Sequence, residues 1–160
     1  MARRIQYPRI AAAPVFSCIQ YDATSNSGYQ TVSPYSWSHT CTGNDRFLVV
    51  GVSMLSVVGS SVSSITYNGV NLSLIRARAS AAGAVRVELW GLTAPATGSN
   101  TITVTLSEAL DSVGNAMSFA GVHQTTPYQA ANDNSATNVG AADATVDITT
   151  VTDDSWVVDT

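Results

Sequence analysis

A chain of 160 residues, of which 45% are hydrophobic and 11% charged, has enough apolar material for one folded domain and too few charges for a disordered protein. Its formal net charge of −4 argues against a surface that binds a phosphate backbone, so we expect no nucleic-acid partner. No apolar run approaches the roughly 18 residues that span a bilayer, which argues against a membrane partner.

Residues 1–14 are predicted to form an extended N-terminal arm, because Pro8 and Pro14 interrupt helices and strand ladders. The arm is basic, whereas the rest of the chain is acidic. Its arginines are Arg3, Arg4 and Arg9. We expect them to bind an acidic neighbouring subunit. The alternative is a frayed terminus without a partner.

Residues 15–160 are predicted to form one β-sandwich domain. Residues 15–21 alternate between two faces and predict a strand, and the polar segment 22–30 after them predicts a loop. Residues 35–41 alternate strictly, which is typical of a half-buried strand. One face of that strand carries Tyr35, Trp37, His39 and Cys41. Residues 47–52 are apolar throughout, which predicts a central strand buried on both faces.

Asn68 and Gly69 mark the clearest turn in the chain. They separate two alternating runs, residues 62–67 and 70–75. This arrangement predicts a type I′ hairpin, because both turn residues then need a positive φ, which Asn and Gly tolerate best.

Residues 85–90 alternate and predict another half-buried strand. Arg86 and Glu88 are expected to face solvent, and the core side is expected to carry Val85, Val87 and Leu89. The segment 107–114 is a loop or one helical turn, and a long loop follows residue 123. Further strands are predicted at 101–106, 115–122, 144–149 and 155–158. About nine strands without an amphipathic helix predict an all-β, two-sheet antiparallel sandwich of jelly-roll or Ig-like type.

The two cysteines, Cys18 and Cys41, are predicted to be buried free thiols. The N-terminal residues lack the apolar core of a secretion signal, and synthesis in a cytoplasm disfavours disulfides. The alternative is a disulfide between neighbouring strands. No further Cys or His stands at ligand spacing, so we expect no metal site at these cysteines.

No catalytic residues and no cofactor are predicted, and we expect the chain not to be an enzyme. His39 lies on an aromatic strand face, where a packed or hydrogen-bonded imidazole is expected. His123, in a loop, has no nucleophile or acid beside it in the sequence. The nucleophile-elbow, zinc-protease and P-loop motifs are absent from the sequence.

A cluster of late aspartates raises the question of calcium, but the glycine and glutamate of a calcium loop are missing. Solvated loop residues are therefore expected at Asp133, Asp143, Asp147, Asp153 and Asp154. Core packing is expected for the three tryptophans, which all lie in predicted strands, Trp37, Trp90 and Trp156. The candidate surface contacts are the loop residues Tyr29, Tyr128 and His123.

Several sequence phrases are similar to a known type of module. They are residues 37–40, 46–52, 65–70, 86–90 and 119–127. They resemble a β-sandwich module that recurs in bacterial extracellular proteins and in phage structural proteins, and the resemblance covers roughly residues 15–160. It implies a fold and carries no catalytic residues. Similar modules continue beyond the last predicted strand, which implies that this chain is part of a longer protein.

The arm and the lack of a recognisable secretion signal favour a virion protein over a secreted module. We therefore expect a non-enzymatic bacteriophage structural protein, a capsid decoration or fibre-associated subunit. Its expected partners are copies of itself and other virion proteins such as the major capsid protein. Its expected location is the virion, after synthesis in the host cytoplasm. The alternative is a β-sandwich module that binds a glycan or a cell surface.

Overall fold

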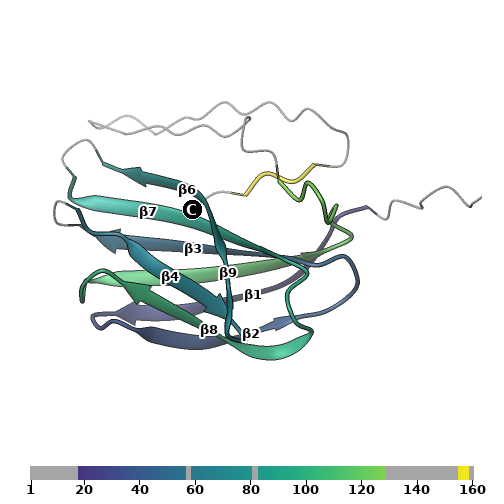
Figure 1. Cartoon of the computed structure of the whole chain (residues 1–160), viewed down its shortest axis with the longest axis horizontal. Helices are drawn as coiled ribbons and strands as arrows, with labels where there is room; N and C mark the ends of the chain where they lie inside the picture. Colours follow the sequence, from purple (N-terminus) through teal and green to yellow (C-terminus); the bar gives the residue numbers. More distant parts are fainter. Residues whose placement is uncertain (1–17, 57–58, 81–82, 129–154, 159–160) are drawn as a thin grey trace, which may run out of the picture.

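The described part of the chain forms two antiparallel sheets that pack face to face (Figure 1). The computed structural model describes residues 18–56, 59–80, 83–128 and 155–158. Within these residues, five strands form one sheet in the order β1-β9-β3-β7-β6, and four form the other in the order β2-β8-β4-β5. The strands are β1 (Gln20–Gln30), β2 (Tyr35–Cys41), β3 (Phe47–Leu55), β4 (Val62–Tyr67), β5 (Val70–Asn71), β6 (Ser73–Ala79), β7 (Val85–Thr93), β8 (Gly98–Leu106) and β9 (Ser112–Ala120). The predicted all-β sandwich is confirmed.

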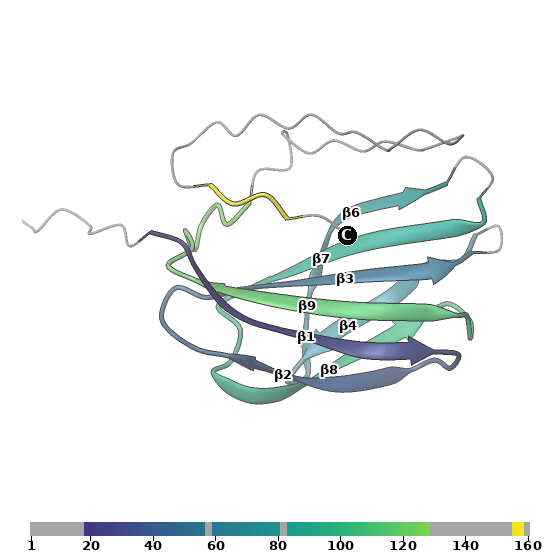
Figure 2. The same cartoon turned by 180° about the vertical axis from the view of Figure 1, so that it is seen from behind.

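The strand pairs are nested along the chain in the manner of a jelly roll. β1 pairs with β9, β2 with β8, β3 with β7 and β4 with β5. The view from behind shows β1 lying beside β9, with β2 and β8 in the sheet below them (Figure 2). Of the two architectures predicted, the strand order is therefore that of a jelly roll.

The predicted hairpin is confirmed at Asn68 and Gly69, whose φ angles are 50° and 76°. The strand predicted after it, residues 70–75, is divided in two. β5 pairs with β4 for two residues, and the buried Leu72 then leads the chain into the other sheet as β6. Leu72 therefore closes the sandwich on this side.

β3 is buried on both of its faces, as its apolar run predicted. Between the sheets, its side chains pack with Ile65 of β4 and Ile102 of β8 in the main core. The residues of β3 that face this core are Leu48, Val50, Val52 and Met54. On the opposite side, Phe47 and Val49 join a second buried cluster with Phe119 and Val122. The five-stranded sheet therefore has an apolar outer face as well as an apolar inner face.

The first strand differs from the sequence prediction. β1 contains the whole of the polar segment predicted as a loop, residues 22–30, and residues 15–17 of the predicted strand lie outside the described residues. Its ladder with β9 is interrupted by bulges, one between Tyr21 and Ala23 and one between Asn26 and Tyr29. The prediction failed because the inward side chains of β1 form hydrogen bonds at the edge of the sandwich and need no apolar alternation.

Glu88 was predicted to face solvent and is instead 1% exposed between the sheets. Its carboxylate accepts hydrogen bonds from Arg86 Nε at 2.5 Å, from the Trp90 indole at 3.0 Å and from the backbone amide of Val62 at 3.2 Å. The core side of β7 thus carries Glu88 and Trp90, while Leu89 packs on the outer cluster. Alternation located the strand but could not identify its inner side, because both faces of the sheet bury apolar residues.

The predicted C-terminal strand is also wrong. Residues 155–158 belong to neither sheet and extend along the outer face of the five-stranded sheet (Figure 2). Trp156 meets Phe119 edge to face, with 5.4 Å between ring centroids, and is 52% exposed. Trp37 and Trp90 are half-buried against the core, so the core prediction fails for Trp156 alone. The predicted strand 144–149 lies outside the described residues.

The two cysteines are not bonded to each other. Cys41 is buried, as predicted, whereas Cys18 is exposed, so the prediction that both are buried is wrong. Burial raises the pKa of the Cys41 thiol, which keeps it protonated.

Replacing Glu88 by alanine should destabilise the fold strongly. The change leaves two N–H donors and the partly exposed Arg86 without their acceptor, and each buried donor left unpaired costs about 1–3 kcal/mol. Glu108→Ala is the matched control, because Glu108 is exposed and accepts one described hydrogen bond, from Ser60. Urea unfolding followed by Trp fluorescence measures both variants. Equal losses in the two would contradict the buried role of Glu88.

Candidate functional site

A group of hydrogen-bonded polar side chains joins the sheets where their edge strands, β1 and β2, lie side by side. Two neighbouring segments complete it, the start of the β2–β3 loop and the C-terminal end of β9. We call this group the polar seam, and its members are Asp22, Ser25, Trp37, His39, Thr42 and Ser118. His39 is almost completely buried in it. The prediction that His39 is a packed, hydrogen-bonded residue is confirmed.

The seam is a chain of hydrogen bonds that crosses from β2 to β1 and β9. The Trp37 indole nitrogen lies 3.0 Å from Ser25 Oγ, which lies 2.8 Å from His39 Nδ1. On the other side of the ring, His39 Nε2 lies 3.0 Å from Ser118 Oγ, which lies 2.7 Å from Asp22 Oδ2. Every polar side-chain atom in this series of hydrogen bonds thus has a partner within the polar seam.

The carboxylate end of this series of hydrogen bonds fixes the directions at Ser118, whereas the Trp37 end fixes only its own bond. The Trp37 indole can only donate, so Ser25 accepts from it, and Ser25 Oγ also bonds to His39 Nδ1. The ionised carboxylate of Asp22 can only accept, so Ser118 donates to it and accepts from His39 Nε2. Nε2 of His39 therefore carries a hydrogen, and in the neutral imidazole Nδ1 accepts from Ser25.

The pKa values agree with this assignment. Burial lowers the pKa of His39 more than the charge of Asp22 raises it, which favours the neutral imidazole. Burial alone would raise the pKa of Asp22, but its hydrogen bonds from Thr42 and Ser118 outweigh that effect and lower it. The backbone amide and the hydroxyl of Thr42 both donate to this carboxylate. The seam therefore holds one fixed negative charge and one neutral histidine.

The composition of the seam is that of a serine hydrolase triad, but its order is different. Ser118 stands between His39 and Asp22, so the carboxylate does not orient the imidazole directly. Ser25 faces the interior of the sandwich edge, where it accepts from Trp37. The pocket described below lies on the other side of β1. The arrangement joins two sheets and fixes a tautomer, and it lacks the geometry of a nucleophile beside a substrate cleft.

The second region is the outer face of the five-stranded sheet. At one end, Phe47 and Phe119 are directly paired and lie beneath segment 121–128 and residues 155–158. That first segment is held by backbone hydrogen bonds from Gly121 to Asn44 and from Val122 to Asp45, at 3.0 and 2.8 Å. We call this the covered end.

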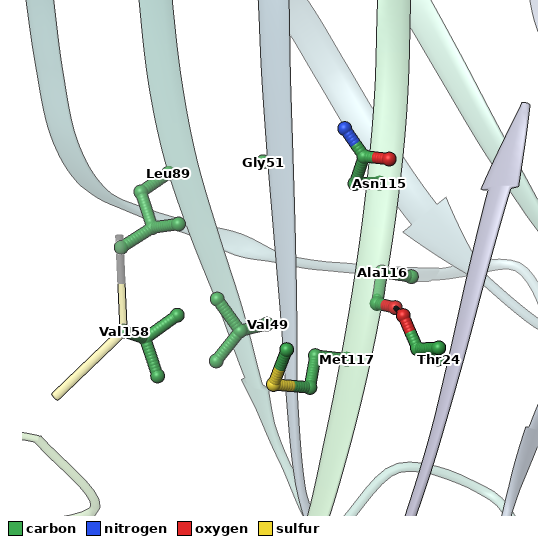
Figure 3. A pocket seen from close by; sticks show the side chains of 8 residues that line it. All are labelled: Thr24, Val49, Gly51, Leu89, Asn115, Ala116, Met117 and Val158. Carbon is green, nitrogen blue, oxygen red and sulfur yellow. Dashed lines mark hydrogen bonds between the residues drawn. The ribbon is translucent and has the colours of Figure 1, made fainter. Parts of the chain in front are cut away.

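A small pocket of about 60 Å³ lies next to the covered end, where Val158 crosses the sheet (Figure 3). Val158, Leu89, Val49 and Met117 surround its apolar side, and Asn115 and Thr24 lie on the other side. Gly51 has no side chain to fill the space between them (Figure 3). The volume suits a few atoms of a ligand or an apolar side chain of a partner, and it is too small for a whole substrate.

The opposite end of the outer face has no described segment over it. Ser53 of β3 is flanked in register by Val113 and Val87, and Tyr29 follows beside Val113. One position further, Leu55 and Val85 form a directly opposed pair that is 52% and 41% exposed. We call this surface the apolar end, and its members are Tyr29, Leu55, Val85, Val87 and Val113.

The three predicted surface contacts fall at both ends of this face. Tyr29, predicted in a loop, is an exposed residue of β1 at the apolar end, where a hydrogen bond with Asp111 raises its pKa. Tyr128 is exposed at the covered end and stacks on Phe47, with 6.0 Å between ring centroids. His123 is exposed, and its Nδ1 accepts hydrogen bonds from the amide and hydroxyl of Thr126. The three do not form one cluster.

Sequence reasoning missed four members of the polar seam, Asp22, Ser25, Thr42 and Ser118. A usable signal existed in β9, where Ser112, Gly114, Ala116 and Ser118 occupy every second position. Such small and hydroxyl-bearing residues on an inward face leave room for side chains from a neighbouring edge strand. No comparable signal marks Asp22, because its partners come from segments far away in the chain.

Arg3, Arg4 and Arg9 lie outside the described residues, as do the five late aspartates. Among the described residues, no three His, Cys, Asp or Glu side chains are placed to hold a metal ion. The described residues contain no helix that is long and apolar enough to cross a membrane. No family model, curated protein or solved structure matches the chain.

Acid should lower the free energy of unfolding through His39. Its folded-state pKa lies below the unfolded value of 6.5, so the unfolded chain binds more protons between these two values. The free energy of unfolding therefore decreases as the pH falls through that interval. Asp22 acts at lower pH. Its contribution to stability is present above pH 3.8, its ordinary pKa, and is lost as the pH falls through its depressed folded-state pKa. Urea unfolding at pH 7.5 and 5.5 should show a loss of stability that is smaller in His39→Asn.

His123→Asn is the matched control, because it removes an exposed histidine and should keep the wild-type pH dependence. The assignment to His39 would be wrong if His39→Asn lost as much stability over this interval as the wild type.

Proposed function

We propose that this chain is a non-enzymatic structural protein of a bacteriophage virion, a capsid decoration or fibre-associated subunit. It works as a homo-oligomer bound to other virion proteins such as the major capsid protein, after synthesis in the host cytoplasm. The jelly-roll strand order supports the proposal, because capsid domains are among the proteins built on this architecture. The same architecture serves lectins, so the fold alone does not decide the role.

The apolar end of the outer sheet face carries the proposal. Leu55 and Val85 expose about half of their side chains as a directly opposed pair, and Val87 and Val113 continue the surface. Exposed apolar patches of this kind typically mark protein–protein contacts. The second copy of the chain is the occupant that a homo-oligomer requires, and 11% charged residues leave few like charges to oppose it.

The internal use of the polar groups supports a role other than catalysis. His39 and Glu88 are the buried residues best suited to acid–base chemistry. The polar side-chain atoms of both form hydrogen bonds with partners within the sandwich. A general acid or base needs an atom free to reach a substrate. The sandwich therefore serves as a rigid scaffold for its surface.

Binding of a glycan or cell surface is the second candidate, and the covered end favours it. Trp156 and Tyr128 are both exposed there, and each rests on a buried phenylalanine ring, Phe119 and Phe47. Supported aromatic rings with an open side suit stacking on the apolar face of a sugar. Segment 121–128 adds hydroxyl and amide groups and no acidic or basic residue other than His123.

Charged residues at the apolar end should weaken self-association. Leu55→Glu and Val85→Glu place a charge on the surface that a second copy would cover, and both positions are already exposed, so the fold should persist. Val70→Glu is the matched control, because Val70 is equally exposed but lies at the tip of the β4–β5 hairpin. Sedimentation velocity should show smaller oligomers for the first two variants only. A monomeric wild type, or virions of the encoding phage that bind no antibody against the chain, would overturn the proposal.

Glycan binding should be visible at Trp156. A soluble polysaccharide that stacks on this ring should shift the Trp fluorescence in a saturable way, and Trp156→Ala should lose the shift. Tyr29→Ala, at the other end of the same face, should keep it. A shift that survives in Trp156→Ala would place the sugar elsewhere and remove the covered end as its site.

A further inference from the structure

The outer face of the five-stranded sheet has the shape of a step. At the covered end, Tyr128 and Trp156 lie on Phe47 and Phe119, so a layer of chain stands above the sheet (Figure 2). At the apolar end, no described segment lies above Leu55 and its neighbours. Two sheets pack face to face about 10 Å apart. A partner sheet can therefore reach the low part of the step only if its own raised part lies elsewhere.

This step restricts how a second copy of the chain can cover the apolar end. A two-fold axis parallel to β3 would stack the two covered ends on each other, because each level of the face would then meet the same level of the partner. An axis perpendicular to β3 exchanges the two ends, so the raised part of each copy lies beyond the apolar end of the other. The step therefore favours a pair in which the two β3 strands run in opposite directions.

An axis of this kind at Ser53, in the middle of the apolar end, brings complementary shapes together. Leu55 and Gly51 lie two residues after and two residues before Ser53 on the same face of β3, so each Leu55 lies opposite the partner's Gly51. Gly51 belongs to the pocket of about 60 Å³ (Figure 3). Val85 lies opposite the partner's Leu89 in the same way, because these residues pair with Leu55 and Gly51. Each copy thus presents an exposed apolar side chain to a hollow in the other.

The charged side chains on this face tolerate the arrangement. Arg78 of β6 pairs with Val87 at the level of Ser53, so it would face its own counterpart. It is exposed on the edge strand, where salt screens two like charges about 10 Å apart. Asp111, at the level of Leu55, would lie opposite the partner's Asn115, an exposed amide that can donate to its carboxylate.

We propose that two copies of the chain form a closed dimer through the outer faces of their five-stranded sheets, with the two-fold axis at Ser53 and Leu55 of each copy in the Gly51 pocket of the other. Because both copies use the same surface, the contact closes at two copies and does not continue into a filament. The inference rests on the self-association in the proposed function, and it adds the orientation of the partner and the residues that determine it.

Thiol crosslinking of the full-length chain tests the orientation. The background variant is Cys18→Ala, which removes the exposed native thiol. Ser53→Cys, on the axis, should be linked into a covalent dimer by a bifunctional maleimide that spans about 10 Å, the usual distance between packed sheets. An equal mixture of Asp111→Cys and Asn115→Cys chains should also be linked, whereas neither chain alone should be, because about 13 Å along the strands separates each residue from its own counterpart. Ser38→Cys, exposed on the other sheet, is the control.

Two substitutions test the contact between Leu55 and the Gly51 pocket. Gly51→Val fills the pocket with a residue that favours strands, and Leu55→Ala removes the side chain that enters it. Each should raise the Kd of the dimer by about tenfold or more in sedimentation equilibrium. The double variant should lose less than the product of the two effects, because the two positions act on each other. Val70→Ala should leave the Kd unchanged, and thermal unfolding checks that every variant is folded.

The crosslinking pattern separates this inference from the proposed function. If the mixture of Asp111→Cys and Asn115→Cys chains were linked no better than either chain alone, the orientation would be wrong even in a protein that self-associates. Purely additive effects of Gly51→Val and Leu55→Ala would equally exclude the contact. A monomeric wild type would overturn the dimer together with the proposed self-association. A dimer with the expected links, from a chain absent from the virions of the encoding phage, would keep the inference and overturn the virion role.

Discussion

A buried imidazole must have a partner for each of its nitrogens, and this requirement governs the edge of the sandwich. Burying an unpaired polar group costs about 1–3 kcal/mol, so His39 is tolerated between two sheets only because Ser25 and Ser118 meet it from both sides. Those hydroxyls in turn bond to a pure donor at one end and a pure acceptor at the other, Trp37 and Asp22. One interior residue thus determines the chemistry of β1, of β9 and of the loop after β2.

The same requirement recurs at Glu88. This residue of β7 pairs with β3 four residues further along that strand than Ser118 does. There a carboxylate replaces the imidazole, and Arg86, Trp90 and the amide of Val62 supply the donors. The amide comes from the opposite sheet, so both polar sites join the two sheets as well as occupying space between them. Satisfied networks of this kind favour one relative position of the sheets over its neighbours, which apolar packing alone does less well.

Local pattern predicted the elements whose burial is apolar and failed where burial is polar. The strand at Tyr35–Cys41, the central run of β3 and the turn at Asn68 and Gly69 were all predictable, because side-chain alternation and turn chemistry act over a few residues. β1 was predicted as a loop because its inward residues bond to partners up to 96 positions away. Glu88 was assigned to the wrong side of β7 because the sheet is apolar on both faces. Apart from the small residues at every second position of β9, the long-range pairing of polar groups leaves no periodic trace in this sequence.

The pairing of Gln20 with Ala120 has a mechanical consequence. Because β1 and β9 are antiparallel neighbours and these residues form one end of their ladder, the first strand begins where the last strand ends. A force applied at Gln20 and Ala120 would therefore separate the two strands from that end, one hydrogen bond after another, and would not load the whole ladder at once. Such an unzipping geometry yields at lower force than a sheared one. The pairing of its first and last strands therefore makes the sandwich poorly suited to carry tension between them.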